Sequence, residues 1–161
     1  MHSQFTKNLL LLKDVLVDNV YHFDKYCEVH ISLPIKPHKC PRCGHITKKI
    51  HDYRKQNIKD IPVLNKPLHL VYRKRRYKCE ECGKNFYETV DFVGRYQRMT
   101  FRLIETIVER LRTNYSMRSI ARDYGLSPCT ITRIFDCLSY SLSKLPEVFS
   151  IDEFKGTTDK G

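Results

Sequence analysis

The sequence predicts an α+β fold in which a small β module is followed by a module of three helices. Two observations carry this prediction. Two Cys-x-x-Cys-Gly motifs enclose a stretch rich in β-forming side chains, between Cys43 and Cys79. Beyond Gly94 the apolar residues instead recur at helical spacing. A chain of 161 residues has room for one ordinary domain or for two to three small ones.

The composition bounds the class of protein. With 41% hydrophobic and 29% charged residues and no Trp, it fits a soluble chain with a limited core and excludes collagen-like, mucin-like and wholly disordered classes. The longest apolar run, Leu9–Leu12, is too short for a membrane span and is followed by no signal-peptide cleavage site. We therefore expect a cytoplasmic protein without membrane contacts.

The positive charge is concentrated in one part of the chain. The whole sequence has 29 basic and 18 acidic residues, a formal net charge of +11. Residues 36–78 contain fourteen Lys or Arg against two Asp, and the remainder is close to neutral. Because each neutralised phosphate releases counterions, a basic module favours nucleic acid as partner over a merely solubilising surface.

The first 33 residues are predicted to have a structural role and to contribute no functional site. Residues 5–17 have the apolar spacing of an amphipathic helix, with one stripe formed by Phe5, Leu9, Leu12 and Leu16. Residues 26–33 alternate as a strand and end at Pro34.

Four of the seven cysteines form a metal-ligand pattern: Cys40, Cys43, Cys79 and Cys82. An odd number of cysteines without an export signal argues against a disulfide framework. Two residues between thiolates let a tight turn direct both sulfurs at one ion, and the two pairs together supply the four ligands of a closed tetrahedral zinc site. A closed site leaves no open coordination position, so we expect structural zinc.

Other uses of these cysteines fit less well. A thioredoxin-like redox motif needs one pair and a βαβ context, and iron–sulfur ligation usually has tighter spacing. Three histidines flank the first motif but are interpreted as surface residues, and three cysteines have no assigned role: His38, His45 and His51, with Cys27, Cys129 and Cys137.

Between the cysteine motifs, residues 46–52, 57–63 and 68–77 read as strands separated by turn residues. Paired cysteine motifs around a hairpin outline a zinc ribbon, which we place at residues 34–92. The last strand carries a dense basic strip, Arg73, Lys74, Arg75 and Arg76. We predict that the strip contacts phosphates, the alternative being an ordinary solvated face.

A helix-turn-helix is predicted within residues 95–145. Residues 101–111 form a first helix with Thr100 as N-cap, and residues 117–124 and 128–138 form the next two. Gly125 suits the left-handed turn between the last two helices. Ser127 and Pro128 suit the N-cap and first position of the recognition helix.

The exposed positions of the recognition helix are candidates for reading bases in a major groove. We predict DNA contacts from five residues: Arg118, Ser127, Thr130, Thr132 and Arg133. Arg133 is the best candidate for guanine, because a guanidinium can bond both acceptors of that base. The alternative is a three-helix core without a DNA role.

The chain resembles the N-terminal part of an insertion-sequence transposase of the ISL-three type. The resemblance rests on CPRCG at residues 40–44, RRYKCEECGKNFYE at residues 75–88, the helix-turn-helix, and FSIDEFKG at residues 149–156. In that family a zinc-binding region and a helix-turn-helix precede an RNase-H-like DDE domain, in which a carboxylate triad uses magnesium to cut and join DNA.

The resemblance implies that residues 146–161 are the start of this catalytic domain and that Asp152 is its first carboxylate. The other two carboxylates are absent, so we expect a truncated transposase that binds DNA without cutting it. Magnesium would belong only to the absent domain.

The expected function is recognition of the terminal inverted repeats of an insertion sequence for DNA transposition, a form of DNA recombination. Double-stranded DNA is the expected partner, a homo-oligomer is allowed for, and the protein would associate with the bacterial nucleoid. The alternatives are an intact transposase of which this is one piece, a zinc-ribbon and helix-turn-helix transcriptional regulator, and a ribbon that contacts proteins.

Overall fold

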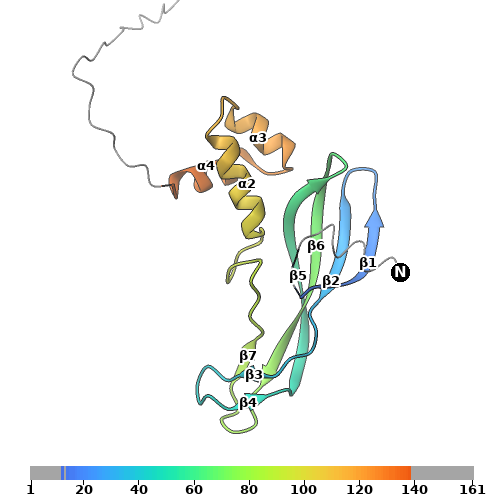
Figure 1. The fold of residues 1–161 in the computed structure, drawn as a ribbon, viewed down its shortest axis with the longest axis vertical. Helices are drawn as coiled ribbons and strands as arrows, with labels where there is room; N and C mark the ends of the chain where they lie inside the picture. Colours follow the sequence, from blue (N-terminus) through green and yellow to red (C-terminus); the bar gives the residue numbers. More distant parts are fainter. Residues whose placement is uncertain (1–11, 13, 139–161) are drawn as a thin grey trace, which may run out of the picture.

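The computed structural model describes residue 12 and residues 14–138 (Figure 1). Its elements, in chain order, are β1 (Leu16–His22), β2 (Cys27–Ser32), β3 (His38–Lys39), β4 (Ile46–Thr47), β5 (Ile50–Val63), β6 (Lys66–Lys78), β7 (Asn85–Tyr87), α2 (Phe101–Leu111), α3 (Met117–Asp123) and α4 (Pro128–Asp136). Figure 1 shows an elongated molecule, with the helices at one end of the β5–β6 hairpin and the short strands at the other. This is the predicted α+β fold.

The β5–β6 hairpin is the axis of the structure. The main sheet has the order β1-β2-β6-β5, with β2 parallel to β6 and the other pairs antiparallel, while β7 pairs with the far end of β6. The hairpin turns at Leu64 and Asn65, whose φ angles of 53° and 61° are those of a type I′ turn. Residues 27–32 thus belong to the same sheet as β5 and β6, although the sequence suggested that the ribbon begins after residue 33.

Two secondary-structure predictions are corrected. The strands expected at 46–52 and 57–63 are instead a two-residue β4 and one unbroken β5, because residues 53–56 pair with β6 although they lack apolar alternation. The helix expected at 5–17 cannot extend to its predicted end. Asp14 has a left-handed φ of 56°, and Leu16 begins β1 by pairing with Ser32 of β2. Residues 5–11 and 13 lie outside the described part.

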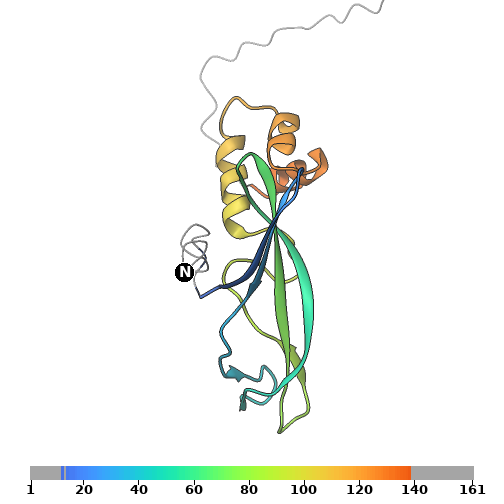
Figure 2. The ribbon, with the colours of Figure 1, turned by 90° about the vertical axis from the view of Figure 1, so that its right-hand side faces the viewer.

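One face of the sheet forms the first core. Its buried members are Leu12, Val15, Cys27, Val29, Ile31, Ile58, Leu68, Leu70, Tyr72 and Val93. The parallel register places Val29 beside Leu70 and Ile31 beside Tyr72, so alternate residues of both strands bury together. Each fully buried apolar side chain contributes about 1.5–3 kcal/mol. The segment between β7 and α2 runs along one side of the sheet (Figure 2).

The second core joins the three helices. It contains Leu103, Ile107, Ile120, Ala121, Tyr124 and Ile131. The predicted caps are confirmed: Thr100 Oγ1 accepts from the N–H of Leu103 at 3.3 Å, and Ser127 Oγ accepts from the N–H of Thr130 at 3.3 Å. Gly125 has a φ of 60°, as predicted for the turn between α3 and α4.

The helical module is attached to the hairpin through β5. The Lys59 N–H donates to the Arg98 carbonyl at 2.8 Å, and the Thr100 N–H donates to the Lys59 carbonyl at 3.0 Å. Lys59 Nζ also donates to the Gly125 carbonyl at 2.7 Å. A Cβ at Gly125 would lie 2.8 Å from Pro67 Cγ, so the turn before α4 is packed closely against the start of β6.

Candidate metal centre and nucleic-acid interface

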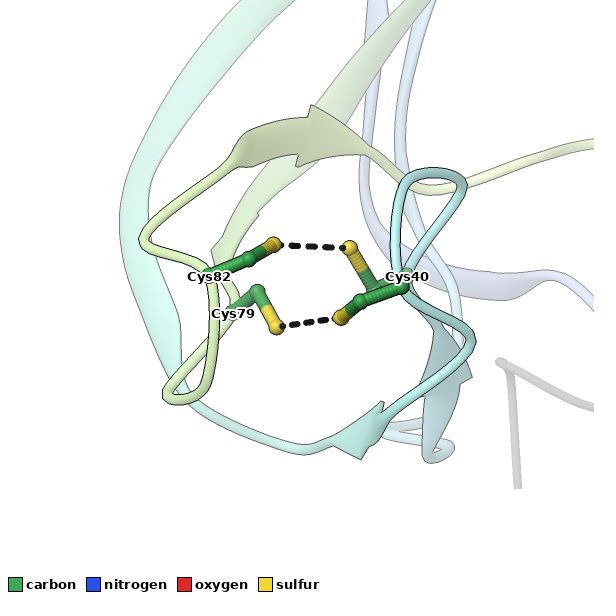
Figure 3. Close-up of side chains that lie close together, drawn as sticks. Cys40, Cys79 and Cys82 are labelled. Carbon is green, nitrogen blue, oxygen red and sulfur yellow. Dashed lines mark hydrogen bonds between the residues drawn. The ribbon is translucent and has the colours of Figure 1, made fainter.

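Four cysteine sulfurs converge at the end of the hairpin opposite the helices. The Sγ atoms of Cys40 and Cys82 are 3.6 Å apart, those of Cys43 and Cys79 are 3.4 Å apart, and all four lie within 4.8 Å of one another. Figure 3 shows the sulfurs of the two loops facing each other. The cluster predicted from spacing is therefore assembled by the fold.

The two cysteine loops have the same backbone geometry. The N–H of Gly44 donates to the Cys40 carbonyl at 3.0 Å, and the N–H of Gly83 donates to the Cys79 carbonyl at 3.1 Å. The two glycines have φ angles of 77° and 68°, a left-handed conformation that costs glycine little. Both loops thus turn tightly enough to present two sulfurs each to one point.

The donor set and its spacing fit zinc. A tetrahedral ion with Zn–S bonds of about 2.3 Å separates its sulfurs by about 3.8 Å, close to the observed distances. Burial opposes ionisation of Cys40, but N–H groups of Cys43 and Arg42 outweigh it and lower the pKa of the thiol to about 6. Although the His45 N–H favours the Cys43 thiolate, the adjacent Cys79 and burial raise the pKa of Cys43 to about 12. A divalent cation would remove this conflict by stabilising all four thiolates.

The flanking histidines do not join the cluster, which among the described residues contains four cysteines alone. The ring of His38 instead lies half-buried, 4.6 Å from the ring of Tyr77, and burial lowers its pKa. The remaining cysteines are apart from the cluster: Cys27 is buried in β2, and Cys129 and Cys137 are exposed.

The structure removes Arg75 from the predicted phosphate-binding strip. Arg75 is 6% exposed, and its guanidinium bonds Glu88 at 3.2 Å and the carbonyls of Leu33 and Pro34. Glu88 also accepts from the Arg75 N–H at 2.7 Å and from the Tyr72 hydroxyl at 2.6 Å. Burial and Glu88 together raise the pKa of Tyr72, so its hydroxyl remains a donor. Arg75 is therefore a structural arginine.

The other strip residues differ in availability. Arg76 is half-buried, with Nε 3.5 Å from a carboxylate oxygen of Asp52. Arg73 is exposed, and its guanidinium carbon lies 4.0 Å from the ring centroid of Tyr53. Lys74 is partly exposed, with Nζ 5.0 Å from the ring centroid of Tyr87. Of the four strip residues, Arg73 and Lys74 are thus the two that reach solvent and have no carboxylate partner among the described residues.

Two basic residues that sequence reasoning missed face these cations across the hairpin. The hairpin register places Lys55 opposite Arg73 and Arg54 opposite Lys74. All four side chains reach solvent at the point where β6 pairs with β5 alone. We name Arg54, Lys55, Arg73 and Lys74 the hairpin cations. The dipeptide Arg54-Lys55 is visible in the sequence, but only the register shows which cations it faces.

The candidate reading residues lie on or beside α4. Thr132 and Arg133 are exposed, and Thr130 is half-buried. The hydroxyl of Ser127 is occupied by its capping bond and by the Thr130 hydroxyl at 2.9 Å. Arg118 is exposed on α3. The fold therefore groups these residues at the helix-turn-helix, whereas Asp152 and residues 146–161 lie outside the described part.

The structure combines a four-cysteine ribbon with a capped helix-turn-helix, and comparisons with known proteins show what each region resembles. Residues 36–82 match the zinc-finger of transposase IS204/IS1001/IS1096/IS1165, and residues 88–136 match the helix-turn-helix domain of transposase family ISL3. The two regions of the chain are thus similar to the zinc-ribbon and helix-turn-helix domains of ISL3 transposases.

A curated relative agrees with this assignment. The transposase for insertion sequence element IS1001 of Bordetella parapertussis is 29% identical over 105 residues. The match covers 63% of this chain and 26% of the relative, so the chain corresponds to about a quarter of that transposase. No solved structure gives a significant match. No helix in the described ranges is long and apolar enough to cross a membrane.

Proposed function

We propose that this chain is the DNA-binding portion of a transposase and that it recognises the terminal inverted repeats of its insertion sequence. The observation that carries the proposal is α4, a capped second helix of a helix-turn-helix that matches the ISL3 family and exposes Thr132 and Arg133. Such a helix enters a major groove with its N-terminal residues toward the bases. Duplex DNA in the nucleoid is the partner, and the protein acts in the cytoplasm.

Zinc has a structural role in this proposal. Cys40, Cys43, Cys79 and Cys82 would hold it, and they leave no coordination position open for a substrate or water. When bound there, the ion would crosslink the two cysteine loops. The loops close the far end of β5 and β6, so bound metal would stabilise the hairpin that carries the basic residues.

The two DNA-contacting parts have different tasks. Thr130, Thr132 and Arg133 read bases, assisted by Arg118 and by the N-terminal turn that Ser127 caps. Arg73 and Lys74 contact phosphates, because they are solvent-facing cations on an extended strand. Arg76 contributes less, since Asp52 competes for it.

The described domains bind DNA and do not cut it. Both family matches concern regions other than a DDE domain, and Asp152 is the residue that resembles the first carboxylate of that domain. Incubating the protein with magnesium or manganese and supercoiled DNA should give no nicking. Reproducible nicking that Asp152→Asn abolishes would contradict the proposal that the chain does not cut DNA.

Selection of bound fragments from a random duplex library tests the recognition proposal. We expect one enriched motif, and we expect that motif in inverted orientation at the ends of the mobile element that encodes the protein. Enrichment of a promoter operator instead would favour a transcriptional regulator, and absence of any enriched motif would contradict sequence-specific recognition.

A further inference from the structure

The face of the main sheet opposite the first core carries an open groove of about 390 Å³. Its lining comes from four strands or their neighbouring turns and is mainly polar and basic: Asp18, Asn19, His30, Tyr53, Arg54, Lys55, Val71 and Arg73. Lys55 and Arg73 stand on its β5–β6 side. The groove is distinct from the zinc centre and from the helix-turn-helix.

Two cations on the basic side of the groove, Lys55 and Arg73, have no carboxylate partner among the described residues. Lys55 and Arg73 lie directly opposite each other on neighbouring strands, an arrangement of like charges that destabilises a sheet. Within the described part of the chain, neither side chain lies within 4.0 Å of a carboxylate. An anion bound between them would offset the repulsion.

Arg73 is already oriented for such an anion. Its guanidinium stacks on the ring of Tyr53, with the guanidinium carbon 4.0 Å from the ring centroid. Stacking restricts the side chain and leaves the N–H edge free for a phosphate, which arginine can bind through two parallel hydrogen bonds.

Two acidic groups near the groove lie on its β1–β2 side and are already engaged, and Asp52 of β5 pairs with Arg54 at 3.5 Å. Asp18 of β1 accepts from the Ser32 hydroxyl at 3.0 Å, and Glu28 of β2 lies 2.6 Å from a ring nitrogen of His30. The positive charge is therefore confined to the β5–β6 side. The positive charge continues along β5 to Lys59, which is four residues beyond Lys55 and therefore on the same face. Lys59 Nζ donates to the Gly125 carbonyl just before α4.

We propose that this groove binds the sugar–phosphate backbone of duplex DNA that flanks the site read by α4. The proposal rests on the proposed function of α4. Arg73 is six residues along β6 from Pro67, which packs beside Gly125, so the groove lies about 20 Å from the start of the recognition helix. That distance corresponds to about six base pairs of B-form DNA.

A paired charge-removal experiment tests the groove. The Lys55→Gln/Arg73→Gln variant removes two charges from the groove, and Lys48→Gln/Lys84→Gln removes two exposed charges near the zinc centre. Each zinc-loaded protein is titrated with two duplexes of about four helical turns, one carrying the selected motif and one of random sequence. Circular dichroism and zinc content verify folding.

In the groove variant, we expect the slope of log affinity against log salt concentration to decrease in magnitude by about two. The ratio of affinities for the preferred and the random duplex should stay unchanged. Its hydroxyl-radical footprint should lose backbone protection about six base pairs to one side of the motif and keep protection of the motif itself. The control variant should change neither the slope nor the footprint by as much.

An unchanged slope and footprint in the groove variant, or an equal loss in the control, would overturn the groove proposal. In either case an Arg133→Ala variant that loses motif preference would leave the function of α4 standing. Wild-type protein without any motif preference would contradict the proposed function instead, and the random duplex would still report phosphate contacts through its salt slope.

Discussion

The Thr100 hydroxyl donates a 2.7 Å hydrogen bond to the buried carboxylate of Asp60. Asp60 belongs to β5 and has a side chain that is 0% exposed, while Thr100 caps α2. Arg102 of α2 adds a second partner, with Nε 2.8 Å from the same carboxylate. One carboxylate thus fixes the first turn of the helical module to the hairpin that carries the zinc loops.

This junction predicts that the two modules unfold together. Asp60→Ala leaves the Thr100 hydroxyl and the Arg102 guanidinium without their acceptor, and we expect it to destabilise the protein by about 1–3 kcal/mol. Denaturant unfolding followed by far-ultraviolet circular dichroism and by hydrogen exchange of the amides of each module should separate into two transitions in this variant. The exposed Asp91→Ala is the matched control and should keep one transition. Coincident transitions in Asp60→Ala would show that the junction does not couple the modules.

The zinc centre predicts one zinc ion per chain. Purified protein should contain that zinc, and Cys79→Ser should lose both the metal and the β structure of residues 34–92, because binding energy at such a site is folding energy. Cys137→Ser, which changes an exposed cysteine outside the cluster, should retain both. Elemental analysis and far-ultraviolet circular dichroism before and after chelation give the readout. Protein that lacks zinc and is unaffected by a chelator would contradict the assignment.

Substitution of Arg75 should lower the stability of the protein, whereas substitution of Arg73 should mainly weaken its binding to DNA. Arg75→Ala removes the partner of Glu88, whose side chain is 1% exposed, and should cost about 3–5 kcal/mol of stability. Arg73→Ala should change stability by less than about 0.5 kcal/mol, because the residue is exposed, and should weaken binding to random DNA. Urea titrations and DNA-binding isotherms of both variants check the contrast. Equal destabilisation by the two substitutions would contradict the structural role of Arg75.

The local features of this fold could be read from the sequence. The cysteine loops, the caps at Thr100 and Ser127 and the glycine turn at Gly125 depend on short-range chemistry, and all were predicted. The features that depend on pairing between distant residues were not predicted. Residues 53–56 lack apolar alternation, so their strand is held by pairing with β6 and could not be seen in the pattern.

The same limit explains the errors at the site. A run of four basic residues, 73–76, looks uniform in sequence, yet Glu88 covers one of them and Asp52 pairs with another. Conversely, Lys55 and Arg73 are eighteen residues apart and become neighbours only through the hairpin register. Charge density shows where the cations are concentrated in the sequence, and only the fold distinguishes structural cations from those that face solvent.

The most direct test of base reading by α4 is the ratio of affinities for the selected motif and for random duplex DNA, measured for wild-type protein and for Arg133→Ala. Arg133→Ala should lower this ratio by a factor that corresponds to about 1–3 kcal/mol and should change binding to random DNA little. A ratio that Arg133→Ala leaves unchanged, and that Lys55→Gln/Arg73→Gln abolishes, would contradict the account and make the hairpin the sequence reader.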